Sequence, residues 1–458
     1  MRNIIDIYTS VFFALIFIIF VVLTRKTKTF KNFAVSDNSI GLFLIFLSFS
    51  ATFIGPGFSM ALVNQGFNTG LFYMFIAGSY GIAKIIEGAV FAPKIRSRFS
   101  NALSIGDIIA GKESHNSKLL HLLTGLVSFG LLIGFSTVLS KAGGEVMNSF
   151  FGISKPLGIT IMTGIVVVYS FFGGIKATII TDAFQFILFT SLIFILFISF
   201  FLNGINIEQL SLNVSELTSA AIAKTNISQY IGLISTWFLG EMLIPPTINR
   251  ILSTKSKSVS KRGLIYSGIF MIIWLFIMLY IGAIINTILP DSKNSEQLLL
   301  IIAQQKLKFG LFGVFAVAIV GIVMSSQDSL INSASVIFTN DIFSPFKNLD
   351  DTQKLYLARL STLVVGGFSI VFALYMPSIL SGLLLIYSLW APAILTPLIA
   401  SIILKKGSSN AAIASMITGI STSLIWRNLS VNEVIPSIIT GLFFSILAYL
   451  IVFKLINR

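Results

Sequence analysis

Several oxygen-bearing side chains lie inside segments of the chain that are otherwise apolar. Asp182 stands between Thr181 and Gln185, near the start of an apolar run that continues to Phe201. A second polar group lies within the apolar segment 309–338 and consists of Ser325, Ser326, Asp328 and Ser329. An ionised side chain at the centre of a bilayer costs about 2.5–3.5 kcal/mol on insertion scales, so it normally has a partner or a function. Because hydroxyl and carboxylate oxygens are ligands of hard cations such as Na⁺, these groups predict an ion-binding site.

Two of the apolar segments carry helix-breaking residues at their middles. Gly55-Pro56-Gly57 interrupts the segment 39–62, and Pro245-Pro246 interrupts the segment 228–250. A proline lacks an N–H group and clashes with the carbonyl four residues before it, and lipid offers the freed carbonyls no partner. We expect carbonyls freed near Ala51–Ile54 to bind a dehydrated cation. The alternative is a simple kink, in which a neighbouring serine or a water satisfies the carbonyls.

The composition places these groups in a membrane protein. Of the 458 residues, 55% are hydrophobic and only 10% are charged, and the mean hydropathy is +0.94. One soluble core could not bury so much apolar surface, whereas a transmembrane helix needs about 20 apolar residues. The sequence predicts an all-α polytopic membrane protein, a single domain over 1–458 with about thirteen transmembrane helices. The predicted spans are 5–24, 39–62, 70–93, 119–146, 155–173, 176–203, 228–250, 263–289, 309–338, 357–376, 378–403, 411–426 and 435–455.

The net charge of +14 is distributed as a topology signal. Lys and Arg cluster in the loops after the first, third and seventh predicted spans, and Arg250 begins the last of these clusters. The loops 63–69 and 376–378 carry neither residue, and 204–227 carries only Lys224. Basic loops stay in the cytoplasm, which predicts an outside N-terminus and a cytoplasmic C-terminus in the cell (plasma) membrane. The same distribution argues against a nucleic-acid partner.

The chain offers little material for redox or transition-metal chemistry. It has no cysteine, so neither a disulfide nor a thiolate ligand is available. Its two histidines, His115 and His121, have no grouping of carboxylates beside them in the sequence. We therefore expect no cofactor and no metal other than Na⁺.

Two motifs resemble those of a known transporter family. The segment Gly173–Gln185, and the run Met324–Ser329 followed by Thr339–Ile342, are similar to signature stretches of the sodium:solute symporter family. The resemblance covers essentially the whole chain. It implies a LeuT-like core of two five-helix repeats with inverted topology. The first repeat would span 39–203 and the second 228–403, with an extra N-terminal helix at 5–24 and two C-terminal helices within 411–455.

The resemblance also implies ion sites, transferred by motif position. The principal sodium site would be formed by the backbone carbonyls of Ala51, Ile54 and Ile322 and the hydroxyls of Ser325 and Ser326. A second sodium site, found in some members, would here involve Asp182, Ser325, Asp328 and Ser329. Asp328 stands where the two-sodium members have a serine, so the presence of a second ion is left open.

The same resemblance places the substrate between the two broken helices. The implied substrate-binding residues are Gly55, Pro56, Tyr80, Trp237, Glu241 and Tyr387. Trp237 and Glu241 match a Trp and a Tyr that face the substrate in proline-symporter-like members. Our hypothesis is that Glu241 pairs with a cationic or amino group of the substrate. The alternatives are a structural pair between Glu241 and Lys84 or a protonated Glu241 that bonds a carbonyl, and Lys84 is also placed to pair with Glu87.

These observations predict a sodium-coupled secondary active symporter that imports a small organic solute by alternating access. An amino acid, an amine or another cationic or zwitterionic compound would fit Glu241. A proton-coupled transporter that titrates Asp182, Asp328 or Glu241, and a membrane-embedded solute sensor, are the alternatives. No P-loop and no convincing catalytic set is present in the sequence, so we do not expect an enzyme. The expected partners are Na⁺, the solute and the lipid bilayer, and we expect the protein to function as a monomer.

Overall fold

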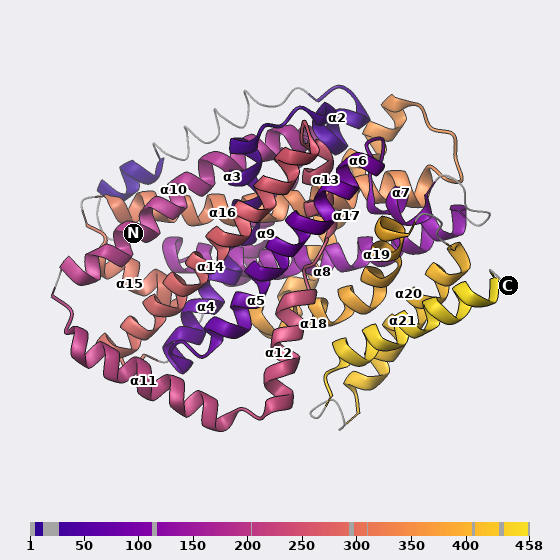
Figure 1. Ribbon diagram of the computed structural model, residues 1–458. Coiled ribbons are helices and arrows are strands. Elements are labelled where there is room, and N and C mark those ends of the chain that lie inside the picture. Colours follow the sequence, from indigo (N-terminus) through magenta and orange to yellow (C-terminus); the bar gives the residue numbers. More distant parts are fainter. Residues whose placement is uncertain are drawn as a thin grey trace.

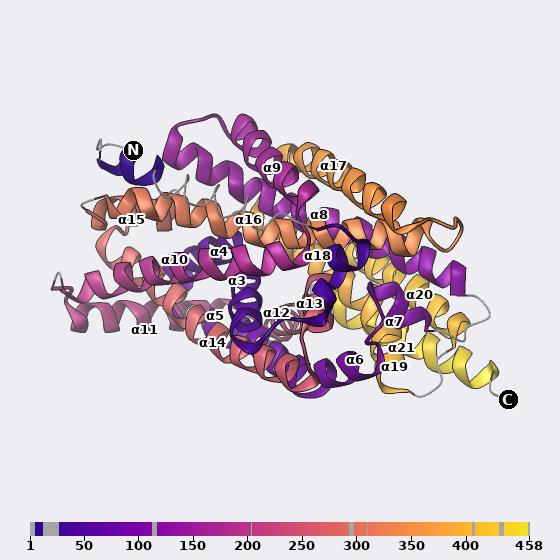
Figure 2. The same cartoon turned by 90° about the horizontal axis from the view of Figure 1, so that it is seen from above.

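The protein is a bundle of packed helices. The computed structural model describes residues 5–11, 27–111, 117–202, 204–292, 297–308, 310–404, 408–429 and 435–456. Most residues in these ranges are helical, and the long helices lie side by side (Figures 1 and 2). Nine of the described helices are long and apolar enough to cross a membrane, and a bent pair at 42–53 and 58–69 adds a tenth span. The predicted all-α polytopic class is confirmed.

The predicted spans between residues 39 and 203 all coincide with helices. The third predicted span continues from α5 through a π-helical stretch, Glu87–Phe91, into α6. The helices of this part are α3 (Leu42–Phe53), α4 (Pro56–Thr69), α5 (Tyr73–Ile86), α6 (Ala92–Arg98), α8 (Ser117–Phe151), α9 (Lys155–Phe172) and α10 (Ile175–Leu202).

The predicted spans between residues 228 and 403 also coincide with helices. The eleventh span contains a π-helical stretch, Ala391–Leu395, between α18 and α19. The helices of this part are α12 (Ile227–Leu239), α13 (Pro245–Ser253), α14 (Lys257–Ile288), α16 (Leu311–Ile337), α17 (Asp351–Tyr375), α18 (Ile379–Trp390) and α19 (Thr396–Ile403). The division into two repeats of five helices stays a prediction.

The remaining helices precede, join or follow these two parts or are short helices within them. The two C-terminal helices pack on each other at the edge of the bundle (Figure 1). Of the predicted first span, residues 5–11 are helical and 12–24 lie outside the described residues. The other helices are α2 (Phe30–Val35), α7 (Ile105–Ala110), α11 (Ile207–Lys224), α15 (Leu298–Lys306), α20 (Ser409–Arg427) and α21 (Ser437–Ile456).

Both predicted helix breaks are present. α3 and α4 are bent by 55° at Ile54–Gly55, and α12 and α13 are separated by an unwound turn at residues 240–244. Pro56 and Pro245 each begin the second half-helix, where a missing N–H group leaves no intrahelical bond unmade. Leu243 has a φ of 54°, a left-handed conformation that is strained for a residue with a branched side chain.

Helix α16 occupies the centre of the bundle. Of its most apolar stretch, 89% is buried, against 28% for α21 at the edge. Every residue from Gly321 to Ile337 is buried, including the serines and Asp328. Small residues allow other helices to approach closely, and hydroxyl groups bond across the contacts. A helix that carries a polar motif and is buried on all sides is a suitable place for an internal site.

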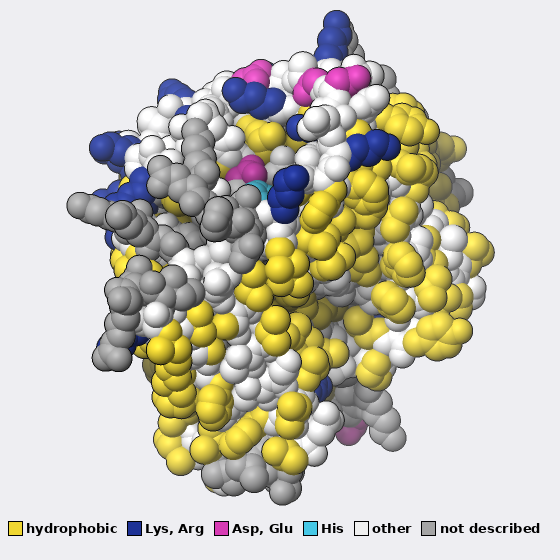
Figure 3. Space-filling model, turned by 90° about the vertical axis from the view of Figure 1, so that its right-hand side faces the viewer, with side chains coloured by type: hydrophobic (Ala, Val, Ile, Leu, Met, Phe, Trp, Pro, Cys, Tyr) yellow, Lys and Arg dark blue, Asp and Glu magenta, His cyan; other side chains and the backbone are white. Residues whose placement is uncertain are grey.

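The outside of the bundle carries the apolar side chains that a lipid environment accepts. Figure 3 shows hydrophobic side chains over much of one face and Lys and Arg side chains towards its upper edge. Among the exposed apolar residues are Phe368 and Phe372 of α17 and Phe443 and Leu450 of α21. This surface agrees with a multi-pass membrane protein.

A close contact between α4 and α14 provides a test of the packing. A Cβ atom at Gly282 would lie 2.1 Å from the Val63 carbonyl oxygen and 2.6 Å from the Phe67 nitrogen. We expect Gly282→Ala to destabilise the protein by about 1–3 kcal/mol, because overpacking forces the two backbones apart. Gly367→Ala is the matched control, since no atom lies within 4 Å of the added Cβ. A thermal-unfolding midpoint that is equal in the two variants would contradict this packing.

Candidate functional site

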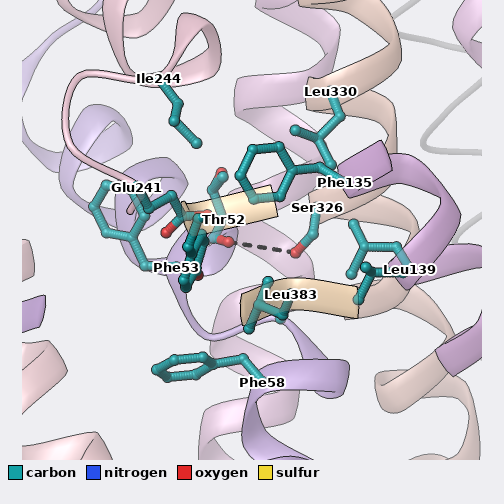
Figure 4. A pocket seen from close by; sticks show the side chains of 13 residues that line it. Thr52, Phe53, Phe58, Phe135, Leu139, Glu241, Ile244, Ser326, Leu330 and Leu383 are labelled. Atoms are coloured by element: carbon teal, nitrogen blue, oxygen red, sulfur yellow. Dashed lines mark hydrogen bonds between the residues drawn. The ribbon is translucent and has the colours of Figure 1, made fainter. Parts of the chain in front are cut away.

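The break between α3 and α4 lies directly against the serines of α16. The Ser326 hydroxyl lies 3.5 Å from the Thr52 carbonyl oxygen, and a Cβ added at Gly55 would lie 2.9 Å from the same hydroxyl. Figure 4 shows Ser326 bonded to Thr52 across the two segments. The broken segment and the polar motif, 274 residues apart in sequence, therefore meet inside the protein.

The predicted ligands of the principal sodium site are all buried at this junction or one turn from it. Ala51, Ile54, Ile322 and Ser325 are fully buried, and Ser326 is 4% exposed. The Ile322 carbonyl accepts hydrogen bonds from the hydroxyls of Ser325 at 3.2 Å and Ser326 at 3.3 Å, whereas the Ile54 carbonyl accepts one from Ser59. The structure thus brings oxygen atoms of the expected kinds together, and their role as sodium ligands stays a prediction.

An arginine stands among the residues predicted for the second sodium site. Arg250 of α13 donates hydrogen bonds from Nη2 to Asp182 at 2.8 Å and to the Ser329 hydroxyl at 2.6 Å. Its Nε donates to Ser48, which in turn donates to Asp182 at 2.6 Å. Arg250 and Asp182 are fully buried. The interpretation of Arg250 as part of a cytoplasmic basic loop is wrong, because its side chain neutralises a buried carboxylate.

Asp328 adds a second carboxylate to this cluster. It accepts hydrogen bonds from Tyr169 at 2.7 Å and from Ser329 at 3.1 Å, and Ser329 also bonds the Ser325 carbonyl. Asp182, Asp328 and Ser329 are therefore together, with Ser325 one turn away. Among the described residues the cluster contains two carboxylates for one guanidinium, and Asp182 Oδ1 has no hydrogen-bond partner.

A cavity of about 50 Å³ lies beside the junction of α3, α4 and α16. Figure 4 shows the rings of Phe58 and Phe135 among its walls, with Glu241 reaching it from the break between α12 and α13. Most of the lining is apolar. The lining residues are Thr52, Phe53, Gly55, Phe58, Phe135, Val138, Leu139, Glu241, Ile244, Ser326, Leu330, Leu383 and Tyr387.

The predicted substrate residues fall in two groups. Gly55, Glu241 and Tyr387 line the cavity, whereas Tyr80 and Trp237 lie behind its wall. The Tyr80 hydroxyl donates to the Glu241 carboxylate, and the Trp237 ring lies 5.0 Å from Phe58 and 6.2 Å from Tyr387. The side chain of Pro56 lies outside the described residues. Apolar lining residues such as Phe135 and Leu383 carry no sequence signal that distinguishes them from residues facing lipid.

A buried ion pair on α5 holds the unwound turn that carries Glu241. Lys84 Nζ lies 2.9 Å from Glu87 and donates to the backbone carbonyl of Glu241 at 2.7 Å. The Leu243 amide lies against the Glu87 carboxylate. In this structure Lys84 therefore pairs with Glu87 and with the main chain of Glu241, rather than with the Glu241 carboxylate.

The prediction that no carboxylates are grouped with the histidines is wrong for His121, which lies near two of them in space. His121 Nε2 lies 3.3 Å from Asp107, and Asp107, His121 and Asp341 have possible ligand atoms within 4.8 Å of one another. Burial raises the pKa of Asp107, but hydrogen bonds from His121, the Leu103 amide and Asn340 outweigh it and hold that pKa below its usual value. Both oxygens of each carboxylate already accept hydrogen bonds. We interpret the cluster as a structural link between α7, α8 and the π-helical stretch Phe338–Phe343 that follows α16.

The fold is shared with solved transporters. A Na⁺-coupled sialic acid symporter in a substrate-bound outward-open state superimposes with a TM-score of 0.85 at 19% identity, covering 99% of this chain and 98% of that one. The nucleobase-cation-symport-1 transporter Mhp1, in a closed conformation, gives a TM-score of 0.61 at 14% identity, with 92% and 94% covered. These similarities confirm the LeuT-like fold.

Sequence comparison identifies the family. Sodium/proline symporter 2 of Staphylococcus saprophyticus is 26% identical over 429 residues, which cover 89% of this chain and 83% of the relative. The sodium/proline symporter of Staphylococcus aureus is 25% identical over 439 residues, with 90% and 84% covered. Residues 33–419 match the sodium:solute symporter family. The chain, whose broken helices meet at a buried polar helix, belongs to the sodium:solute symporter family.

Proposed function

We propose that this protein is a sodium-coupled symporter that imports a small organic solute across the cell membrane by alternating access. The observation that carries the proposal is the contact between the unwound end of α3 and the buried hydroxyls of α16, where the Thr52 carbonyl lies 3.5 Å from Ser326. Unwound carbonyls and serine hydroxyls are the oxygen ligands that a dehydrated Na⁺ needs. The carbonyls of Ala51, Ile54 and Ile322 and the hydroxyls of Ser325 and Ser326 would hold the ion.

The coupling of sodium binding to solute transport follows from the position of this site between α3 and α16. A sodium ion that joins α3 to α16 would favour the outward-open form and complete the cavity for the solute. Binding of the solute would then favour an occluded form, from which rocking of one helix group opens the inside. The membrane orientation in this scheme has the N-terminus outside and the C-terminus in the cytoplasm, and the transporter acts as a monomer.

The available driving force is sufficient for accumulation. One Na⁺ that moves down about 100 mV releases ~2.3 kcal/mol, and a tenfold concentration gradient adds ~1.4 kcal/mol. The total of ~3.7 kcal/mol supports a gradient of several hundredfold for each coupled ion.

Sodium binding to the purified protein tests this proposal. We expect NaCl, and not KCl at equal ionic strength, to raise the thermal-unfolding midpoint. When Na⁺ is a hundredfold above its Kd, the free energy of unfolding should increase by about 2.7 kcal/mol. The double variant Ser325→Ala/Ser326→Ala should lose this stabilisation. Ser335→Ala is the control, since among the described residues its hydroxyl bonds the Ile331 carbonyl of the same helix, away from the proposed site. Equal stabilisation by Na⁺ and K⁺, or an unchanged sodium response in the double variant, would contradict the site.

Proton coupling is the second candidate, and the Asp182–Arg250–Asp328 cluster favours it. Among the described residues two buried carboxylates lie near one guanidinium, which is paired with Asp182, so the charge of Asp328 lacks a cation unless a proton or a metal ion provides it. Solute uptake into proteoliposomes distinguishes the candidates. Uptake that continues without sodium and collapses with a protonophore would select proton coupling, whereas uptake that follows an imposed sodium gradient selects sodium.

A further inference from the structure

The Glu241 carboxylate faces the cavity and has no cationic partner among the described residues. Its residue lines the cavity, and the hydroxyl of Tyr80 is the hydrogen-bond donor that the structure gives it. None of the ion pairs formed by the described residues includes Glu241. An acid in an apolar cavity is costly unless a positive charge or a proton accompanies it.

The two buried cations among the described residues, Lys84 and Arg250, are already paired with other acids. Lys84 is paired with Glu87 at 2.9 Å and is directed at the backbone oxygen of Glu241. Arg250 is paired with Asp182 at 2.8 Å. Moving either cation to Glu241 would leave its own partner buried and unpaired, at a cost as large as the gain. A cation that pairs with Glu241 would therefore come from outside the described protein groups.

The walls of the cavity suit an organic cation with an apolar body. Phe58, Phe135 and Tyr387 line it, and Trp237 packs against two of these rings. Aromatic faces attract ammonium groups, including quaternary ones, when water is excluded. None of the thirteen lining residues is Lys, Arg or His, so a carboxylate on the solute would find no protein cation there and would be repelled by Glu241.

We propose that the transported solute is a compact organic cation, an amine or quaternary ammonium compound without an acid group, whose charged nitrogen pairs with Glu241 in the aromatic cavity. The proposal rests on the symport function above and specifies its substrate class. Betaine-like and amino acid zwitterions, neutral solutes, and a Glu241 that is neutralised by a proton alone are the other possibilities, and each gives a different result in the test.

A matched set of probes tests the charge requirement on the unmodified protein. In saturating NaCl, the purified transporter is titrated with tetramethylammonium, choline, methylammonium, glycine betaine, proline and 3,3-dimethylbutan-1-ol, and binding is followed by the unfolding midpoint. The last compound has the shape of choline without its charge, and betaine adds an acid group to the same trimethylammonium head. We expect at least one of the three cations to bind at least about tenfold more tightly than betaine, proline and the neutral isostere.

The Glu241→Gln variant tests the residue. We expect it to lose affinity for the best cation by at least about tenfold, whereas Glu216→Gln, an exposed acid on α11, should not. Sodium stabilisation without any organic probe should persist in both variants. Unchanged cation affinity in Glu241→Gln, equal or tighter binding of betaine, proline or the neutral isostere, or no binding of any cation would overturn the inference while leaving symport intact. Failure of Na⁺ to stabilise the unmodified protein would instead overturn the proposed function.

Discussion

Replacing Arg250 with methionine should destabilise the protein by about 3–5 kcal/mol, because it leaves buried carboxylates without their cation. Arg250 is fully buried and bonds Asp182, Ser48 and Ser329 at 2.6–2.8 Å. The methionine keeps much of the apolar stem, so the loss reports mainly on the charge. The measurement is the unfolding midpoint, together with the fraction of protein that stays monodisperse after extraction from the membrane.

Two further variants separate charge from packing at this position. Asp182→Asn in the Arg250→Met background should restore at least half of the lost stability, because the orphaned carboxylate is removed with its partner. Arg262→Met changes an exposed arginine near the start of α14 and should cost less than about 0.5 kcal/mol. If Arg250→Met were as stable as Arg262→Met, the buried pair would not contribute to the fold.

The pairing of Asp182 with Arg250 could be predicted only in part from the sequence. Asp182 was recognisable as a buried acid in need of a partner, because it stands in an apolar run. Its partner could not be recognised, because Arg250 comes just before a loop rich in Lys and Arg and looks like the first residue of that basic cluster. Only the packing of the short helix α13 against α3, α10 and α16 directs its side chain inward. The sequence does contain one sign that Arg250 points inward. It lies one turn after Pro246, in a short helix whose first turn must be buried in the protein.

Long-range contacts explain the other differences. The apolar spans and the two proline breaks follow from local composition, and for the spans after the first the helices lie at the predicted places. His121 meets Asp107 and Asp341 only because α7, α8 and the end of α16 converge. The lining residues Phe135 and Leu383 belong to helices with many similar side chains, so the sequence alone could not identify them as part of the cavity wall. Motif position, by contrast, placed Ser326 beside the broken helix correctly.

The second large effect is expected at Lys84, which links the helix break to the cavity. Lys84→Met removes the cation of the fully buried Glu87 and the hydrogen bond to the Glu241 carbonyl. We expect a loss of about 3–5 kcal/mol in stability, because an unpaired buried carboxylate remains. The unwound turn around Leu243 is already strained at a φ of 54°. It would also lose the hydrogen bond from Lys84 that holds it to α5.

The double variant Lys84→Met/Glu87→Gln distinguishes stability from positioning. It removes both charges, so most of the stability should return, since neutral replacement of a buried pair is often tolerated. The donor to the Glu241 carbonyl is still missing, so the carboxylate should be less well held, and affinity for the best cationic probe should stay at least about threefold below that of the unmodified protein. Thermal unfolding and probe titration measure the two effects separately. Full recovery of both would show that the ion pair stabilises α5 alone, and a stable Lys84→Met single variant would show that Glu87 does not need its lysine.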